Sequence, residues 1–276
     1  MNLISVESLA HSLGDHLIVD CRFSLADTNL GEQQYLEGHI PGARYAHLDE
    51  HLSGKITADT GRHPLPDFDK LVAQLGQWGI DEPSRVVVYD DASGSYASRL
   101  WWLLRTLGHT EVAVLDGGIQ AWQAAGEKLE AGIPVYSPAR FKAALNRRAW
   151  SDTTQLQQQL ATGDCVLIDA RAKERFDGVT EPIDPVAGHI PGSVNMPVTT
   201  NFDSNGFFLA AGTLRENYLD VMGGATPEQV IHSCGSGVFA CLAILAMEIA
   251  GLNDSRLYPG SWSEWIRDPE RGVATK

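Results

Sequence analysis

The chain has 276 residues, of which 43% are hydrophobic and 20% are charged, and its formal net charge is −14. This composition is ordinary for a globular protein and excludes intrinsic disorder as the main theme. An acidic chain has no electrostatic attraction for nucleic acid or for an anionic membrane surface, so neither is expected as a partner. At roughly 150 residues per domain, the length favours two modest domains.

Short apolar runs rich in β-branched residues recur along the chain. They lie at residues 17–20, 86–89, 112–115, 166–168, 230–231 and 256–258. Because the runs are continuous rather than alternating, they are typical of strands buried on both faces of a parallel sheet. Helical patterns at 68–78, 97–107 and 238–250 lie between them, and each is followed by a glycine. The alternation predicts α/β domains with helices on both faces of a mainly parallel sheet.

The two halves of the sequence repeat one pattern in the same order. Two motifs mark the repeat: GHIPG, at 38–42 and 188–192, and Asp-x-Arg after a strand, at 20–22 and 169–171. The repeat predicts two tandem domains of one fold, covering 1–135 and 150–276. The Gly132–Trp150 stretch, with its prolines, is the expected linker.

The cysteines and the apolar segments indicate a reducing compartment. The four cysteines are Cys21, Cys165, Cys234 and Cys241, too few for a disulfide scaffold and wrongly spaced for zinc. The first residues lack the basic and apolar regions of a signal peptide, and the longest apolar run, 238–247, is too short to span a bilayer. We therefore expect a cytoplasmic protein with free thiols.

Cys234 carries the strongest chemical signal. It follows a predicted strand and precedes Gly235, Ser236 and Gly237, after which an apolar helix begins. The glycines let the backbone curl around the sulfur, so that its N–H groups and the helix dipole can stabilise a thiolate. The other interpretation is a buried structural cysteine. The repeat aligns Asp90 with Cys234, and a carboxylate cannot be a thiol nucleophile, so we expect only the second domain to be catalytic.

With these motifs, and with GSWSEW at 260–265, the chain resembles the two-domain rhodanese-type sulfurtransferases over nearly its whole length. The loop CGSGV at 234–238 looks like the version found in 3-mercaptopyruvate sulfurtransferases. The resemblance implies a persulfide on Cys234 and no metal or organic cofactor. It also implies a loop that cradles the persulfide, made of Gly235, Ser236, Gly237, Val238 and Phe239.

The resemblance also implies partners and binding residues. A small anionic donor supplies the sulfur, and cyanide, a thiol or a thioredoxin-like protein accepts it. Arg175 matches the arginine that binds the donor carboxylate, and His63 matches a histidine of the cleft between the domains. Asp169 and Arg171 are expected to form a supporting pair. Relatives specific for mercaptopyruvate carry a second arginine where this chain has residues 180–185 without one, which leaves thiosulfate open as the donor.

Other functional classes make different demands on the sequence. A cysteine phosphatase of this fold needs an arginine six residues after the cysteine, where this chain has Ala240. A cysteine peptidase or glutaminase needs a histidine base, and His232 lies on the same side of the strand as Cys234 by period-two geometry. A non-catalytic binding or regulatory module would have no need of Cys234. Cys241 is expected in the helix core, with a redox role as the alternative.

Overall fold

The computed structural model describes residues 2–276, and the chain divides into two compact units. The first unit comprises the residues up to Gly54 together with Leu65–Asn146. The second comprises Arg147–Lys276 and also Lys55–Pro64, a segment that comes from the first half of the sequence.

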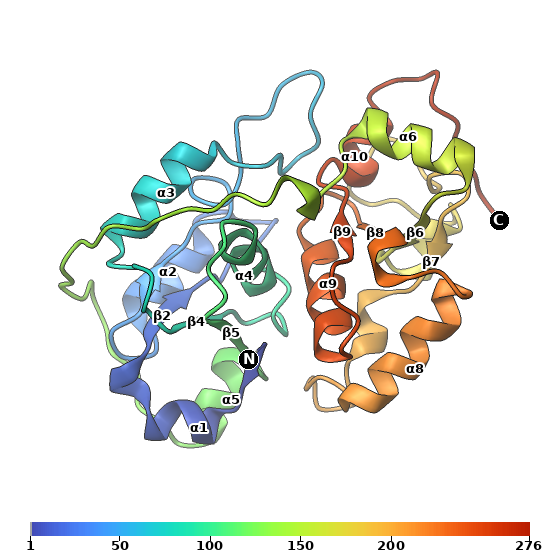
Figure 1. Ribbon diagram of the computed structural model, residues 1–276. Helices are drawn as coiled ribbons and strands as arrows, with labels where there is room; N and C mark the ends of the chain where they lie inside the picture. Colours follow the sequence, from blue (N-terminus) through green and yellow to red (C-terminus); the bar gives the residue numbers. More distant parts are fainter. Residues whose placement is uncertain (1) are drawn as a thin grey trace. The chain divides into compact units, whose positions relative to one another are not determined.

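The first unit is built on a five-stranded sheet in which every pair of neighbouring strands is parallel. The strand order is β1 (Leu3–Ile4), β5 (Val112–Leu115), β4 (Val86–Tyr89), β2 (Leu17–Asp20) and β3 (Arg44–Tyr45). Its helices are α1 (Val6–His11), α2 (Leu30–Glu37), α3 (Phe68–Gln77), α4 (Ala97–Thr106) and α5 (Gly118–Ala124) (Figure 1).

The second unit repeats this plan with a four-stranded parallel sheet. The strand order is β7 (Val194–Asn195), β6 (Val166–Asp169), β8 (Val230–Ser233) and β9 (Arg256–Leu257). Its helices are α6 (Thr153–Thr162), α7 (Lys173–Phe176), α8 (Ala211–Met222), α9 (Phe239–Ile249) and α10 (Ser261–Trp265). Short 3₁₀ turns complete the two units at 13–15, 147–149, 198–201 and 227–229.

Each face of the second sheet has its own apolar core. On one face, α8 and α9 cover Ile168 and Val230 through side chains such as Leu214 and Met247. On the other face, α6 and α10 cover Leu167 and Ile231 through side chains such as Leu156 and Trp262 (Figure 1). Successive residues of a strand point to opposite faces, so strands covered on both sides are apolar throughout. The predicted α/β fold with mainly parallel sheets is confirmed.

The ends of the elements follow local chemistry. The Asp67 carboxylate caps α3 by accepting hydrogen bonds from the backbone N–H groups of Asp69 and Lys70. Asp152 and Gln155 form a capping box at the start of α6, and Gly163 closes that helix in the left-handed conformation. All strands of a parallel sheet end at the same edge, so β6 and β8 deliver Asp169 and Cys234 to one edge of the second unit.

Candidate active site

Cys234 lies between the end of β8 and the loop that leads into α9, and 4% of its surface is exposed. Its backbone N–H donates to Ser261 Oγ at 3.0 Å, and its carbonyl oxygen accepts from the Trp262 N–H, also at 3.0 Å. Ser261 has a φ of +51°, a left-handed conformation that is uncommon for a residue with a side chain. The start of α10 therefore fixes the backbone of the cysteine.

Gly237 provides the contact with the thiol. Its backbone N–H donates to Cys234 Sγ at 3.2 Å. Its φ is +80°, and a Cβ atom at this position would lie 2.3 Å from the carbonyl oxygen of Pro259. Only glycine fits this conformation and this space without strain. The N-terminus of α9 follows at once, so its positive dipole end adds to the field around the sulfur.

The equivalent loop of the first unit contains Asp90. This carboxylate is fully buried and accepts four backbone hydrogen bonds of 2.7–2.8 Å. The donors are the N–H groups of Ala92, Gly94, Tyr96 and Ala97. A loop after the central strand of this fold thus gathers N–H groups around a negatively charged side chain. A persulfide on Cys234 would extend a similar distance from its own backbone.

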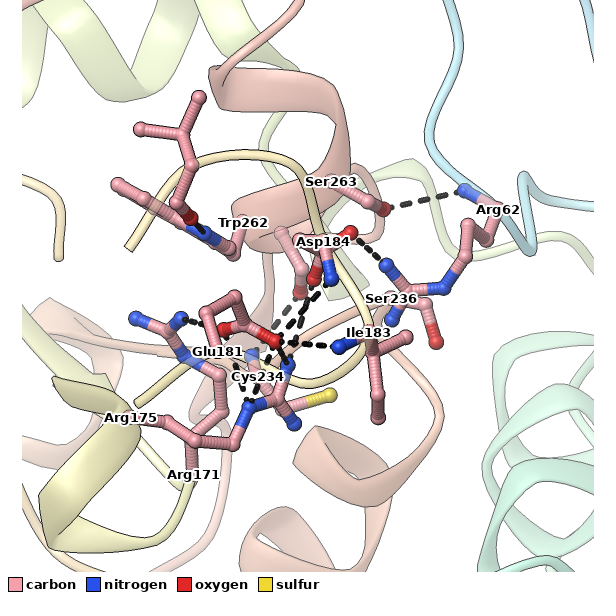
Figure 2. Close-up of polar contacts among 12 residues, drawn as sticks. Arg62, Arg171, Arg175, Glu181, Ile183, Asp184, Cys234, Ser236, Trp262 and Ser263 are labelled. Atoms are coloured by element: carbon pink, nitrogen blue, oxygen red, sulfur yellow. Dashed lines mark hydrogen bonds and ion pairs between the residues drawn. The ribbon is translucent and has the colours of Figure 1, made fainter. Parts of the chain in front are cut away.

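Arg175 lies on α7, and its guanidinium group is held by two carboxylates. Nε donates to both oxygens of Glu181 at 3.0 and 3.1 Å, and Nη2 donates to Glu181 Oε1 at 2.7 Å and to Asp184 Oδ2 at 3.3 Å (Figure 2). Burial alone would raise the pKa of Glu181, but the hydrogen bonds from Arg175 and from two backbone N–H groups outweigh burial and lower it. Glu181 therefore stays ionised and orients Arg175.

Asp169 and Arg171 form a buried ion pair at the end of β6. Arg171 donates to both oxygens of Asp169 at 2.7–3.1 Å and to the carbonyl of Gly188 at 2.7 Å. Its guanidinium carbon lies 4.7 Å from the centre of the Trp262 ring, and Nη1 contacts Glu181 at 3.3 Å. Arg171 is thus fully engaged in supporting the loop that holds Arg175.

The Lys55–Pro64 segment brings two more side chains to the loop after β8. His63 Nδ1 lies 2.7 Å from Ser236 Oγ, within hydrogen-bond distance. The backbone N–H of Arg62 donates to Ser263 Oγ at 3.1 Å, and its side chain forms an ion pair with Asp184 (Figure 2). Neither Arg62 nor Asp184 was expected at the site from the sequence. The motif GRHPLP at 61–66 has no repeating pattern of apolar residues, so the sequence does not indicate which domain it packs against.

Two of the other cysteines, Cys21 and Cys241, and the histidine His232 have different surroundings. Cys21 is buried, and burial together with Asp20 and Asp90 raises the pKa of its thiol, which stays protonated. Cys241 is also buried, with Sγ 3.4 Å from the carbonyl oxygen of Gly237. His232 Nε2 lies 3.0 Å from Met247 Sδ, and burial lowers the pKa of His232 to about 3. Because His232 faces the core under α9, it is not the base that a peptidase would need.

Within residues 2–276, no three His, Cys, Asp or Glu side chains gather in a way that could hold a metal ion. None of the helices formed by these residues is both long and apolar enough to cross a membrane.

Comparison with known proteins places this geometry in context. The model of the rhodanese-like domain matches residues 5–125 and again residues 152–268. A protein of Pseudomonas aeruginosa named "Probable 3-mercaptopyruvate sulfurtransferase" is 45% identical over 277 residues, covering 99% of this chain and 98% of the relative. Rat thiosulfate sulfurtransferase is 33% identical over 285 residues, covering 99% and 95%.

Solved structures show the same similarity. The 3-mercaptopyruvate sulfurtransferase of Leishmania major superposes with a TM-score of 0.85 at 32% identity, covering 96% of this chain and 74% of that one. The corresponding enzyme of Escherichia coli superposes with a TM-score of 0.82 at 30% identity, covering 95% and 98%. In both alignments the similarity extends over almost all of this chain.

Proposed function

Since the chain belongs to the rhodanese-like family, in two copies of the domain, we propose that it is a sulfurtransferase that moves a sulfane sulfur from 3-mercaptopyruvate to a thiophilic acceptor through a persulfide on Cys234. One observation carries the proposal. In a chain of this family, the loop CGSGV aims the Gly237 N–H at Cys234 Sγ from 3.2 Å.

The first half-reaction loads the enzyme. The Cys234 thiolate attacks the sulfur of the donor, and an S–S bond forms as the C–S bond breaks. The electron pair of the C–S bond leaves with carbon as the enolate of pyruvate, which then takes up a proton. Backbone N–H groups of the loop stabilise the negative charge on the outer sulfur, in the way that an oxyanion hole stabilises oxygen.

The second half-reaction unloads the enzyme. The acceptor attacks the outer sulfur, the S–S bond breaks, and its electron pair returns to Cys234 as a thiolate. Because the donor's remainder leaves before the acceptor reacts, the kinetics should be ping-pong. The proposed acceptor is a thiol or a thioredoxin-like protein, with cyanide as the laboratory substitute. The two steps require neither a metal ion nor an organic cofactor.

Arg175 is the proposed binding residue for the donor anion. Its planar fork suits a carboxylate, and its neighbours Glu181 and Asp184 hold it in place. The alternative donor is thiosulfate, which would react by the same mechanism and release sulfite. The absence of an arginine from residues 180–185 favours this alternative, and so does the similarity to rat thiosulfate sulfurtransferase.

The division of labour between the halves is also part of the proposal. Residues 1–135 would form a rhodanese-like domain without catalytic activity, because Asp90 occupies the position of the nucleophile, and residues 150–276 the catalytic domain. Free cysteines at all four positions agree with a reducing compartment, and we place the protein in the cytoplasm. Cell fractionation with an antibody to the native chain tests that assignment.

Steady-state kinetics with 3-mercaptopyruvate and thiosulfate as alternative donors test the function. We expect turnover with cyanide as acceptor, a higher kcat/KM with 3-mercaptopyruvate, and complete loss of activity in Cys234→Ser. Mass spectrometry should find one additional sulfur on Cys234 after exposure to the donor alone. Activity retained in Cys234→Ser would refute the mechanism. A chain inactive with both donors would instead support a binding or regulatory module.

A further inference from the structure

Ser261, the first residue of α10, has a backbone conformation that disfavours side chains. Its φ is +51°, and its surface is fully buried. Within residues 2–276, the other residues that combine a side chain with a positive φ are Ser93 and Asp254, and neither of them is buried. A side chain in the left-handed region costs free energy that glycine avoids. Such strain persists where another requirement outweighs it, and it is frequent at functional sites.

The first unit places a glycine at the equivalent position. Gly118 begins α5 with a φ of +59°, and the N–H of the residue after it donates to the Asp90 carbonyl oxygen at 3.0 Å. In the second unit, the Trp262 N–H makes the same bond to the Cys234 carbonyl oxygen, also at 3.0 Å. The turn therefore forms with glycine and without strain, so the turn alone does not explain the serine of the second unit.

The hydroxyl group of Ser261 connects the cysteine to the end of β9. Ser261 Oγ accepts a hydrogen bond from the Cys234 N–H at 3.0 Å and donates one to the Tyr258 carbonyl oxygen, again at 3.0 Å. Tyr258 directly follows β9, and its own N–H donates to the His232 carbonyl oxygen of β8 at 2.8 Å. A glycine in place of the serine would take this acceptor away from the buried N–H of the cysteine, which is costly.

The two units hold the loop after the central strand in different ways. In the first unit the Asp90 side chain holds it, by accepting four backbone hydrogen bonds. In the second unit the Gly237 N–H donates to Cys234 Sγ at 3.2 Å, and sulfur is a weaker acceptor than a carboxylate. In the proposed reaction the sulfur also changes, from a thiolate to a longer persulfide and back. An anchor on the backbone of the cysteine holds the loop equally in both states.

We propose that Ser261 is a positioning residue for sulfur transfer, whose hydroxyl group keeps the Cys234 backbone in one place while the sulfur is loaded and unloaded. The Gly237 N–H then stays aimed at the sulfur, and the strained conformation of Ser261 is maintained for the sake of this hydrogen bond. The inference rests on the proposed function and extends the reactive machinery from the loop at 234–238 to the start of α10.

Alkylation of Cys234 tests this role without relying on sulfur transfer. Iodoacetamide is uncharged, so its rate reports the reactivity of the thiolate and not the binding of an anion. We expect Ser261→Ala to slow alkylation about tenfold at neutral pH, because the sulfur moves away from the Gly237 N–H and the thiolate loses a hydrogen bond. Mass spectrometry of the Cys234 peptide measures the labelling, with Cys234→Ser as the background.

Ser261→Gly separates positioning from folding. Glycine lacks the hydroxyl group, as alanine does, but it adopts a φ of +51° without strain. Ser261→Gly should therefore unfold at a higher temperature than Ser261→Ala and still be alkylated about tenfold more slowly than the parent protein. If alkylation instead follows stability, so that Ser261→Gly reacts like the parent, the hydroxyl group serves only the fold and the proposal is overturned.

Ser233→Ala is the matched control. Ser233 is also buried and precedes Cys234, but its Oγ donates to the Ile168 carbonyl oxygen of β6 at 3.4 Å. Its loss should change the alkylation rate by less than about twofold. An equal decrease in Ser233→Ala would mean that any buried hydroxyl group beside the thiol has this effect. That result, or an unchanged rate in both Ser261 variants, would refute the positioning role.

Steady-state kinetics provide the second readout. With the donor that the parent protein prefers, both Ser261 variants should lower kcat about tenfold and leave KM within about twofold, because the reactivity of the thiolate changes and donor binding does not. A raised KM with an unchanged kcat would contradict the proposal. Should the parent protein transfer no sulfur from 3-mercaptopyruvate or thiosulfate, the proposed function fails, and the alkylation rates still decide whether Ser261 positions Cys234.

Discussion

His63 and Ser236 are 173 residues apart in the sequence, and yet Nδ1 of the one lies 2.7 Å from Oγ of the other. Both side chains are nearly buried, and Ser236 is only two residues from Cys234. A histidine hydrogen-bonded to a hydroxyl group can pass a proton through it. In the proposed reaction, this pair would be placed to supply the proton that the enolate of pyruvate needs when it leaves.

This relationship predicts a dependence on the donor. Ser236→Ala and His63→Gln should each lower kcat with 3-mercaptopyruvate about 100-fold, the usual contribution of general acid catalysis. With thiosulfate, kcat should change much less, because sulfite leaves as an anion and needs no proton. Single-turnover release of pyruvate and of sulfite measures the two cases. An equal loss with both donors would mean that the pair serves only to shape the loop.

Gly237→Ala tests whether the loop after Cys234 stabilises the persulfide. The new methyl group would meet the Pro259 carbonyl, and alanine is strained at a φ of +80°. We expect the free energy of unfolding to fall by about 2 kcal/mol or more, and the persulfide to decay faster as the Gly237 N–H moves away from Cys234. Urea denaturation and mass spectrometry of the loaded enzyme measure these effects.

Gly212→Ala provides the control for that substitution. Gly212 lies in α8, and nothing lies within 4 Å of the position its Cβ would take. Alanine favours a helix by up to about 1 kcal/mol over glycine, so this variant should be no less stable than the parent. If Gly237→Ala and Gly212→Ala have the same stability and the same persulfide lifetime, Gly237 does not stabilise the persulfide.

Asp90 should matter for stability and not for catalysis. Asp90→Ala leaves four buried N–H donors without their acceptor, which should lower the free energy of unfolding by about 3 kcal/mol. Because the proposed chemistry resides in the second unit, kcat and KM should not change. Asp91→Ala, one residue further on and half-buried, is the control and should cost less than about 1 kcal/mol. A fall in kcat for Asp90→Ala, at a temperature where the protein is folded, would contradict the division of labour.

His232 should make stability depend on pH. Burial lowers the pKa of its folded form to about 3, from an ordinary value of 6.5. Between pH 6.5 and about pH 3, the unfolded chain therefore binds a proton at His232 and the folded chain does not. The free energy of unfolding consequently decreases as the pH is lowered through that range. The slope contributed by this residue approaches about 1.4 kcal/mol per pH unit.

Replacing His232 by leucine removes the pH-dependent contribution of this side chain to the free energy of unfolding. The free energy of unfolding of His232→Leu should therefore fall less steeply than that of the parent from pH 6 to pH 4.5. Denaturation curves at several pH values measure the difference in slope. If the two proteins lose stability with equal slopes, the folded and unfolded chains bind a proton at His232 at the same pH. Burial would then not lower the pKa of His232.

Sequence patterns predicted the elements that depend on long apolar runs. The first-unit strands at 17–20, 86–89 and 112–115 have the predicted limits, and α9 begins and ends within one residue of its prediction. Buried runs of this kind determine a strand by themselves. The two-residue strands β1, β3 and β7 were not predicted, because none of them lies in a run like that at 256–258, which revealed the equally short β9.

The candidate site could be predicted only in part. Cys234 and its loop stand out because glycines, a strand end and an apolar helix are adjacent in the sequence. The roles of Arg62 and Asp184 depend on contacts between residues that are 122 positions apart. No local pattern distinguishes Arg62 from a surface arginine, and a carboxylate in the 180–185 loop has no visible partner until the chain has folded.

The Lys55–Pro64 segment has a consequence for the history of this chain. Duplication normally leaves one copy free to decay or to be deleted once the other performs the chemistry. Here, deleting the copy that lacks a cysteine at the position of Cys234 would also delete Arg62 and His63, since the segment leaves the first unit after Gly54 and rejoins it at Leu65. Under the proposed division of labour, selection for sulfur transfer would therefore also preserve the half without the nucleophile, because cutting the gene at the linker would remove the Lys55–Pro64 segment from the second unit.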